Sequence, residues 1–187
     1  ETVTGRKIAL QERVTRADMA LLLMEELKLD TLYALRVPGG VFSPGQGGEK
    51  GEDRNGSAAT AKDIVRHARK TAIEGFLMTG TRGLDLYPDG AFRPDDPLNR
   101  ASYARIAADI LSKVLGGPYL ETRFAGRRSP FSDVPADSPC FPAVMLMTSR
   151  GIMEVQDATA GIFNPLGPIS GTDALLGLRR IRDELKY

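Results

Sequence analysis

The sequence predicts a mainly α-helical fold built from helix–loop–helix repeats that are joined by long loops. Three observations predict it: a helix start that occurs three times, an apolar stripe at helical spacing after each start, and a Gly-x-Phe-x-Pro loop before two of the three. The 187 residues, 42% hydrophobic and 26% charged, have the composition of an ordinary globular protein with a core of its own.

The repeated helix start lies at residues 14–20, 98–104 and 169–175. Each copy has a capping residue and, three positions later, a second polar residue, which in the first and third copies is an acid that favours the positive end of the helix. These pairs are Thr15 and Asp18, Asn99 and Ser102, and Ser170 and Asp173. An apolar residue before each cap and another five positions on form a hydrophobic staple: Val14 and Met19, Leu98 and Tyr103, and Ile169 and Ala174. We therefore expect helices over 14–27, 98–113 and 169–185, meeting in one bundle.

The loops before the second and third starts share Gly-x-Phe-x-Pro, at Gly90–Pro94 and Gly161–Pro165. Pro88-Asp-Gly90 predicts a tight turn, because Pro presets φ and Gly accepts a positive φ. We expect Phe92 and Phe163 to fill the core between helices. Residues 4–13 are a faint first copy of this loop, with Ile8 in the position of the phenylalanine.

A further helix is expected upstream of two of the loops, over residues 61–79 and 142–150. The first copy has no room for such a helix, so we count two full units and one partial unit. Residues 38–60 are rich in Gly, Ser and charge and predict an exposed, mobile loop. Residues 116–130 form a second irregular stretch, whose Arg123, Arg127 and Arg128 suit either a solvated loop or a contact with anionic glycan or lipid.

The composition argues against several classes of protein. The net charge is +1, which does not suggest nucleic-acid binding. A single cysteine, Cys140, and a single histidine, His67, leave no intramolecular disulfide and no Cys/His zinc cluster. The aspartates between 85 and 96 fit a Ca²⁺ loop poorly, since Tyr87 stands where a ligand would be needed. We expect no catalytic residues, no metal site and no cofactor.

These residues resemble the motifs of the S-layer homology family. Phe131-Ser-Asp-Val134 matches the start of that family's pattern, and His67-Ala-Arg-Lys70 matches its His-Trp-Ala helix with Ala68 in place of tryptophan. Residues 87–94 match its loop closely. Thr15-Arg-Ala-Asp18 and Asn99-Arg-Ala-Ser102 match its Thr-Arg-Ala-Glu helix start. The resemblance covers about two and a half divergent repeats.

The resemblance implies a pseudo-threefold bundle within one domain over residues 1–187. Its parts would be a partial first repeat at 1–29, an insertion loop at 30–60, a second repeat at 61–117, a linker at 118–129 and a third repeat at 130–187. The resemblance further implies grooves that hold anionic cell-wall polysaccharide, with the arginine of each helix start contacting the anionic group. The ligand-binding residues carried over are Arg16, Asp18, His67, Lys70, Asp89, Gly90, Asn99 and Arg100.

Two departures from the family pattern stand out. Gly171 replaces the arginine in the third start, and the chain contains no tryptophan. We therefore expect one of two functions: a non-catalytic cell-envelope module that anchors to an envelope polysaccharide or a surface layer, or a structural subunit that docks protein partners on the same scaffold.

The expected location is extracytoplasmic, at the cell envelope or cell surface, and periplasmic or associated with the outer membrane in a Gram-negative cell. No signal peptide is visible at Glu1, as in an exported protein after cleavage or in a cytosolic one. No apolar run of about 18 residues is present to span a bilayer. An oligomer is possible.

Overall fold

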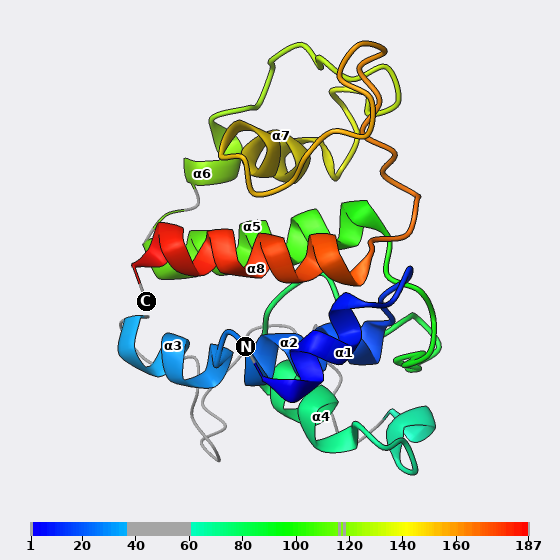
Figure 1. The fold of residues 1–187 in the computed structure, drawn as a ribbon. Helices are drawn as coiled ribbons and strands as arrows, with labels where there is room; N and C mark the ends of the chain where they lie inside the picture. The colour runs from blue at the N-terminus through cyan, green and yellow to red at the C-terminus, as the bar shows by residue number, and fades with distance from the viewer. Residues whose placement is uncertain (1, 37–60, 116, 118, 187) are drawn as a thin grey trace.

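The computed structural model describes residues 2–36, 61–115, 117 and 119–186. Within this part the fold is mainly helical, as predicted, and its helices pack as a bundle. The helices are α1 (Val3–Ala9), α2 (Arg16–Glu25), α3 (Leu29–Arg36), α4 (Lys70–Met78), α5 (Arg100–Leu115), α6 (Tyr119–Thr122), α7 (Phe141–Ser149) and α8 (Gly171–Leu185). Figure 1 shows α5 and α8 side by side across the middle, with α6 and α7 above and with α1, α2 and α4 below.

The three predicted helix starts are confirmed. Thr15 accepts from the amide of Asp18 while the Asp18 carboxylate accepts from the amide of Thr15, which completes a capping box at α2. Asn99 and Ser170 each accept from the amide three residues later, at 2.7 and 3.1 Å. The staple residues before the caps are fully buried, and so are their partners, as are Phe92 and Phe163. Each helix therefore begins where its local sequence dictates.

The residues before the three caps form a closed ring of main-chain hydrogen bonds. The amide of Val14 donates to the carbonyl of Ile169 at 3.0 Å, and the amide of Ile169 donates to the carbonyl of Leu98 at 3.0 Å. The amide of Leu98 donates back to the carbonyl of Val14 at 2.8 Å. This ring gives the bundle its pseudo-threefold centre.

Helices from successive units pack in pairs around this centre. The second helix of one unit lies against the first helix of the next, as α2 does on α4 and α5 on α7. The third pair is α8 on α1, so α1 occupies the place of the missing first helix. The expectation that the first copy has no such helix is wrong: residues 3–9, expected to form a loop, are helical, and Ile8 is buried at the end of α1.

The continuous helix expected over 61–79 is also wrong. A 3₁₀ turn at Lys62–Ile64 precedes α4, which begins only at Lys70. The reason is Asp63, whose carboxylate accepts from the amides of Phe92 and Arg93 at 3.1 and 2.6 Å. Asp133 accepts in the same way from the amides of Phe163 and Asn164, at 3.0 and 2.6 Å. Each aspartate thus holds the Gly-x-Phe-x-Pro loop of its own unit. The other expected helix, over 142–150, is confirmed as α7.

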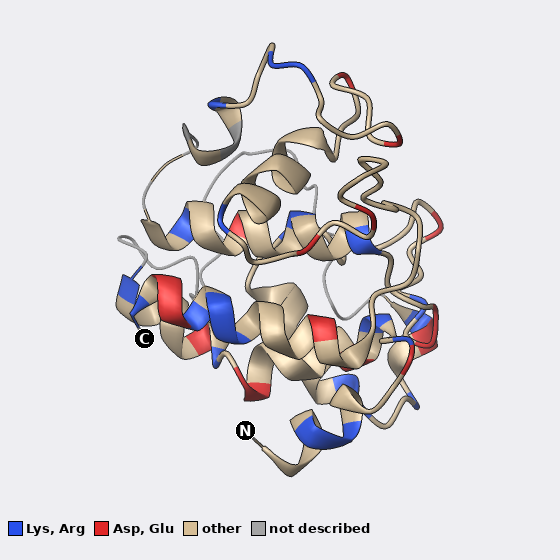
Figure 2. Ribbon diagram, turned by 45° about the horizontal axis from the view of Figure 1, so that its top comes forward, with Lys and Arg blue, Asp and Glu red and all other residues tan. Residues whose placement is uncertain are grey.

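The two connecting stretches contain helices that the sequence did not predict. Helix α3 begins at the last residue of the expected first repeat and continues into the expected insertion at 30–60, and α6 lies within the expected linker. The mobile loop expected at 38–60 lies outside the described residues. In Figure 2 the ribbon positions of basic and acidic residues are interspersed along the helices. Among the described residues, no helix combines the length and the hydropathy needed to cross a bilayer.

Candidate functional site

The arginines of the first two helix starts dock on the loop of the following unit. Arg16 donates from Nε to the carbonyl of Phe92 at 2.7 Å and from Nη2 to the carbonyl of Asp85 at 2.8 Å. Arg100 donates from Nε to the carbonyl of Phe163 at 2.9 Å and from Nη2 to the carbonyl of Glu154. The two guanidinium groups therefore make equivalent hydrogen bonds in successive units. Each of them joins its own unit to the next.

Arg16 is closed off from solvent, with 7% of the residue exposed. Its guanidinium carbon lies 4.8 Å from the ring centroid of Phe92 and 4.9 Å from that of Tyr87, within cation–π range. Burial lowers the pKa of Arg16, opposed by Tyr87 and three nearby carboxylates. The guanidinium remains charged and is satisfied by its own chain.

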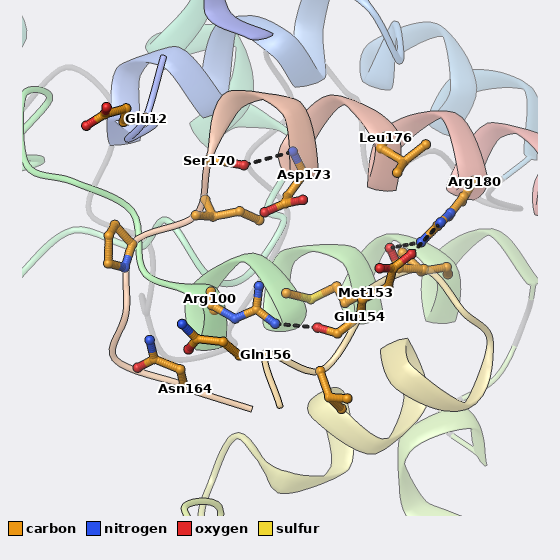
Figure 3. Close-up of a pocket in the computed structure, with 14 residues that line it drawn as sticks. Glu12, Arg100, Met153, Glu154, Gln156, Asn164, Ser170, Asp173, Leu176 and Arg180 are labelled. Atoms are coloured by element: carbon orange, nitrogen blue, oxygen red, sulfur yellow. Dashed lines mark hydrogen bonds and ion pairs between the residues drawn. The ribbon is translucent and has the colours of Figure 1, made fainter. Parts of the chain in front are cut away.

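Arg100 instead lines an open groove with a volume of about 380 Å³. The groove lies between the start of α5, the loop of the third unit and the exposed face of α8 (Figure 3). Its polar lining residues are Glu12, Arg100, Glu154, Gln156, Asn164, Ser170, Asp173 and Arg180. Burial lowers the pKa of Arg100 also, opposed by the carboxylates of Asp173 and Asp133.

The charges in the groove nearly balance. Glu154 and Arg180 form an ion pair at 2.9 Å, and the other charged groups of the lining are Arg100, Glu12 and Asp173. Of these two carboxylates, Asp173 acts electrostatically on Arg100. Apolar side chains, among them Met153 and Leu176, complete the lining. A surface of this kind suits a hydroxyl-rich ligand that carries little net charge or one isolated anionic group.

The remaining predicted ligand residues lie in different parts of the structure. Asn99 caps α5 beside Arg100, whereas Asp18 is 2% exposed and bonds to Thr15 and Arg69. His67 lies 3.3 Å from the carboxylate of Asp95 in the turn before α4.

Three of these residues lie at the surface near the second unit. Lys70 forms an i,i+4 pair with Glu74 at 3.6 Å. Asp89 pairs with Arg93 at 2.9 Å, and Gly90 adopts a φ of +77° in the predicted turn. The carboxylate of Asp89 accepts from the amide of Ala91 and from Arg93, and these bonds lower its pKa. Of the eight predicted residues, the structure therefore places only Arg100 in the lining of the open groove, with Asn99 next to it in the chain as the cap of α5. The other six residues lie elsewhere.

The third helix start has no arginine because there is no space for one. Gly171 donates its amide to the carbonyl of Gln11 at 2.9 Å, and a Cβ atom on Gly171 would overlap the carbonyl oxygen of Ile8. The end of α1 thus lies where the Cβ atom of an arginine would have to begin. This close contact with the end of α1 explains why a glycine, Gly171, replaces the arginine of the family pattern in the third helix start.

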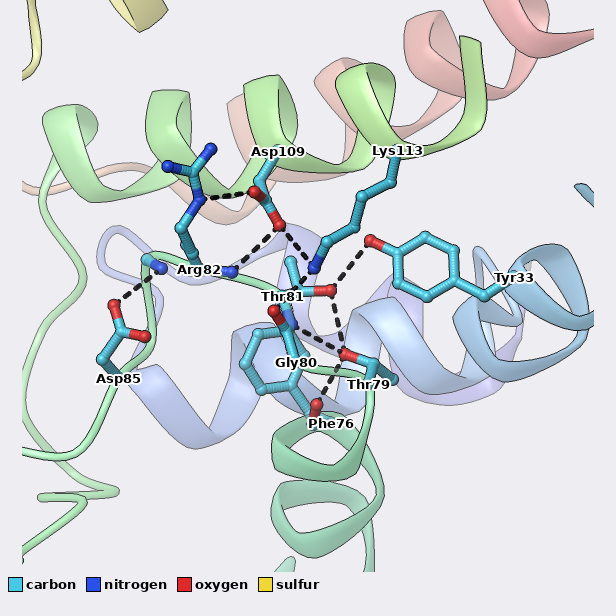
Figure 4. A network of polar contacts seen from close by, with 10 residues as sticks. Tyr33, Phe76, Thr79, Gly80, Thr81, Arg82, Asp85, Asp109 and Lys113 are labelled. Carbon is cyan, nitrogen blue, oxygen red and sulfur yellow. Dashed lines mark hydrogen bonds and ion pairs between the residues drawn. The ribbon is translucent and has the colours of Figure 1, made fainter. Parts of the chain in front are cut away.

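A buried polar network that the sequence did not reveal joins α3, α4 and α5 (Figure 4). Asp109, 3% exposed, pairs with Arg82 at 2.6 Å and with Lys113 at 2.8 Å. Nearby, the hydroxyl of Tyr33 bonds to that of Thr81 at 2.8 Å, and burial raises the pKa of Tyr33. The charged groups of the network pair with one another, so we infer that the network stabilises the fold.

Several groove residues were missed in the sequence, notably Gln156, Asn164, Asp173 and Arg180. Asn164 could have been found, since it lies in the Gly-x-Phe-x-Pro motif of the third unit that the sequence analysis singled out. Arg180 and Glu154 are far apart in the sequence, and no motif connects them. Within the described residues, no group of three or more potential ligand side chains is arranged to hold a metal ion.

Comparison with known proteins finds a family match within the third unit. Residues 130–175 match the family model described as the S-layer homology domain. The matched segment contains α7, the loop that lines the groove, and the start of α8. Among curated proteins, none matches the chain.

Proposed function

Because the chain carries an S-layer homology domain at residues 130–175, we propose that it binds an envelope polysaccharide through the groove beside Arg100. Domains of this family are non-catalytic modules that attach proteins to cell-envelope polysaccharide, which associates the chain with the cell envelope or cell surface. Here the chain would act as an extracytoplasmic anchor, held to the polymer or to a surface layer, and periplasmic or on the outer membrane in a Gram-negative cell.

The observation that carries this proposal is the chemistry of the groove. It combines two guanidinium groups, two amide side chains, three carboxylates and a hydroxyl with several apolar side chains. Sugars present hydroxyl groups, which such donors and acceptors bind, and apolar ring faces, which pack on aliphatic side chains. The guanidinium of Arg100 is also the one cation in the groove without a carboxylate bound to it among the described contacts, so it would meet an acidic substituent of the polymer.

A co-sedimentation experiment with purified envelope polysaccharide tests the proposal. The variant Gln156→Ala with Asp173→Ala removes two side chains that line the groove, while both main-chain bonds of Arg100 remain. We expect the affinity to fall about tenfold or more, since each lost hydrogen bond contributes about 0.5–1.5 kcal/mol and about 1.4 kcal/mol corresponds to a factor of ten. The matched control is Asp137→Ala with Asp183→Ala, two exposed positions outside the groove.

Equal retention of the groove variant and the control would refute the groove as the binding site. A parallel arm uses polysaccharide from which acidic substituents have been removed. Weaker binding in that arm would show that Arg100 meets an anionic group.

A second candidate function, docking of a protein partner, is favoured by a different surface. A groove of about 380 Å³ between α2 and α4 is lined largely by apolar atoms, from Leu21, Met24, Ala68 and Ala72 among others. Exposed apolar surface of this kind is typical of protein interfaces. If the wild-type chain does not bind polysaccharide, Met24→Asp in a capture assay with other envelope proteins tests this alternative.

A further inference from the structure

The loops of the second and third units place two pairs of residues in equivalent positions. The amides of Tyr87 and Gln156 each donate to the carbonyl just before the loop phenylalanine, both at 2.9 Å. Arg93 and Asn164 each follow that phenylalanine, with φ of +54° and +59°, and each donates its amide to an aspartate of its own unit at 2.6 Å. The main chain therefore makes the same hydrogen bonds at both pairs of positions, although the turn between them is two residues longer in the third unit, and the side chains differ.

In the second unit these side chains close the space beside Arg16. The ring of Tyr87 lies 4.9 Å from the guanidinium carbon of Arg16 and 4.1 Å from that of Arg93. Asp89 holds Arg93 in place with an ion pair at 2.9 Å. An aromatic ring and a second guanidinium thus cover the arginine that the helix start supplies.

In the third unit the equivalent side chains are the two amides, Gln156 and Asn164, and both line the open groove. Arg100 retains its phenylalanine neighbour, with Phe163 at 4.6 Å, but no ring stands where Tyr87 does. The first unit offers no equivalent space, because the end of α1 lies against Gly171. In the described structure, the site beside the helix start is therefore open in the third unit and covered by side chains in the second. The corresponding site at Gly171 is blocked by the end of α1.

We propose that Tyr87 and Arg93 act as a plug, so that the chain binds its polymer through a single groove although it repeats the scaffold three times. The identity of the ligand in this inference rests on the proposed function. The existence of the plug rests on the side-chain geometry alone. A module with one groove gains no avidity from its own repeats. Tight attachment would then require several copies along one polymer.

A reciprocal exchange of side chains tests the plug. The opened variant carries Tyr87→Gln with Arg93→Asn, and the closed variant carries Gln156→Tyr with Asn164→Arg. The first readout needs no polysaccharide: phenylglyoxal labelling followed by peptide mass mapping compares Arg16 with Arg100. We expect Arg100 to react severalfold faster in the wild type, and Arg16 to gain severalfold in the opened variant. Labelling of Arg16 at the wild-type rate in the opened variant would overturn the plug.

The second readout is calorimetric titration with oligosaccharide fragments of the envelope polysaccharide. We expect one site per chain in the wild type, two in the opened variant and none in the closed variant. Two sites in the wild type, or unchanged binding by the closed variant, would overturn the inference. Circular dichroism and thermal unfolding verify that both variants fold. If the wild type binds no fragment, the proposed function fails, and the labelling result still decides whether the plug exists.

Discussion

Gly171 and Ile8 lie so close that a Cβ atom on Gly171 would overlap the carbonyl oxygen of Ile8. The contact joins the start of α8 to the end of α1 and closes the third interface between units. It replaces the arginine docking of the other two interfaces with direct packing of main chain on main chain.

Replacing Gly171 with alanine should destabilise the fold by about 2 kcal/mol, since the backbone of α1 must move to accept the methyl group. Urea denaturation measures the change in the free energy of unfolding. The control is Gly75→Ala in α4, where the new Cβ would lie 3.1 Å from the flexible end of Met24. The control should be near neutral, because the gain in helix propensity of up to about 1 kcal/mol offsets the close contact. Equal effects at both glycines would contradict the proposed role of the contact.

Replacing Asp133 with alanine should cost about 1–3 kcal/mol, because two amides in the loop of the third unit lose a charged acceptor. Asp63→Ala should cost a similar amount, since Asp63 makes the same two bonds in the second unit. Thermal unfolding of both variants, beside Asp137→Ala at an exposed position, checks the prediction. An Asp133 variant as stable as the Asp137 variant would show that the loop holds its shape without the carboxylate.

Replacing Asp109 with alanine should destabilise the fold by about 2 kcal/mol, because Lys113 and Arg82 lose their buried carboxylate. The partners are partly exposed, which limits the loss. In a double-mutant cycle, adding Lys113→Met to the alanine variant should cost less than Lys113→Met alone. Additive costs would mean that the pair is not coupled.

Glu26 should make the stability depend on pH. Burial alone would raise its pKa, but bonds from the hydroxyl and amide of Thr2, both at 2.6 Å, outweigh burial and lower it. A carboxylate with a lowered pKa in the folded state stabilises fully above its unfolded pKa of about 4.3. That stabilisation is lost as the pH falls through the folded pKa.

The stability difference between wild type and Glu26→Gln should therefore be constant from about pH 6 to 8 and narrow below about pH 4. Denaturation curves at a series of pH values measure it. A difference of the same size at pH 3 and pH 7 would rule out Glu26 as the titrating group.

Features that depend on neighbouring residues could be predicted from the sequence. The caps at Thr15, Asn99 and Ser170 and the turn at Gly90 were found because each is decided within a few residues. The prediction of a continuous helix over 61–79 was wrong because the structure there depends on a contact with residues distant in the sequence. Asp63 bonds to amides of a loop some 30 residues away, and that long-range contact overrides the helical spacing.

Features that depend on the three units meeting could not be predicted. The docking of Arg16 on the carbonyl of Phe92 looks the same in the sequence as that of Arg100 on Phe163, yet only Arg100 borders a groove. Likewise, α1 was missed because residues 3–9 have a weak helical pattern and are held by α8, a partner from the far end of the chain.

The ring through Val14, Leu98 and Ile169 also constrains how the molecule forms. Each member supplies an amide to one neighbour and a carbonyl to the other, so two members cannot complete the circuit without the third. Before α8 is in place, only the bond from Leu98 to Val14 has both of its partners. We therefore expect the ring to close only when all three units are present, so that removal of α8 would destabilise the whole bundle and not one unit alone.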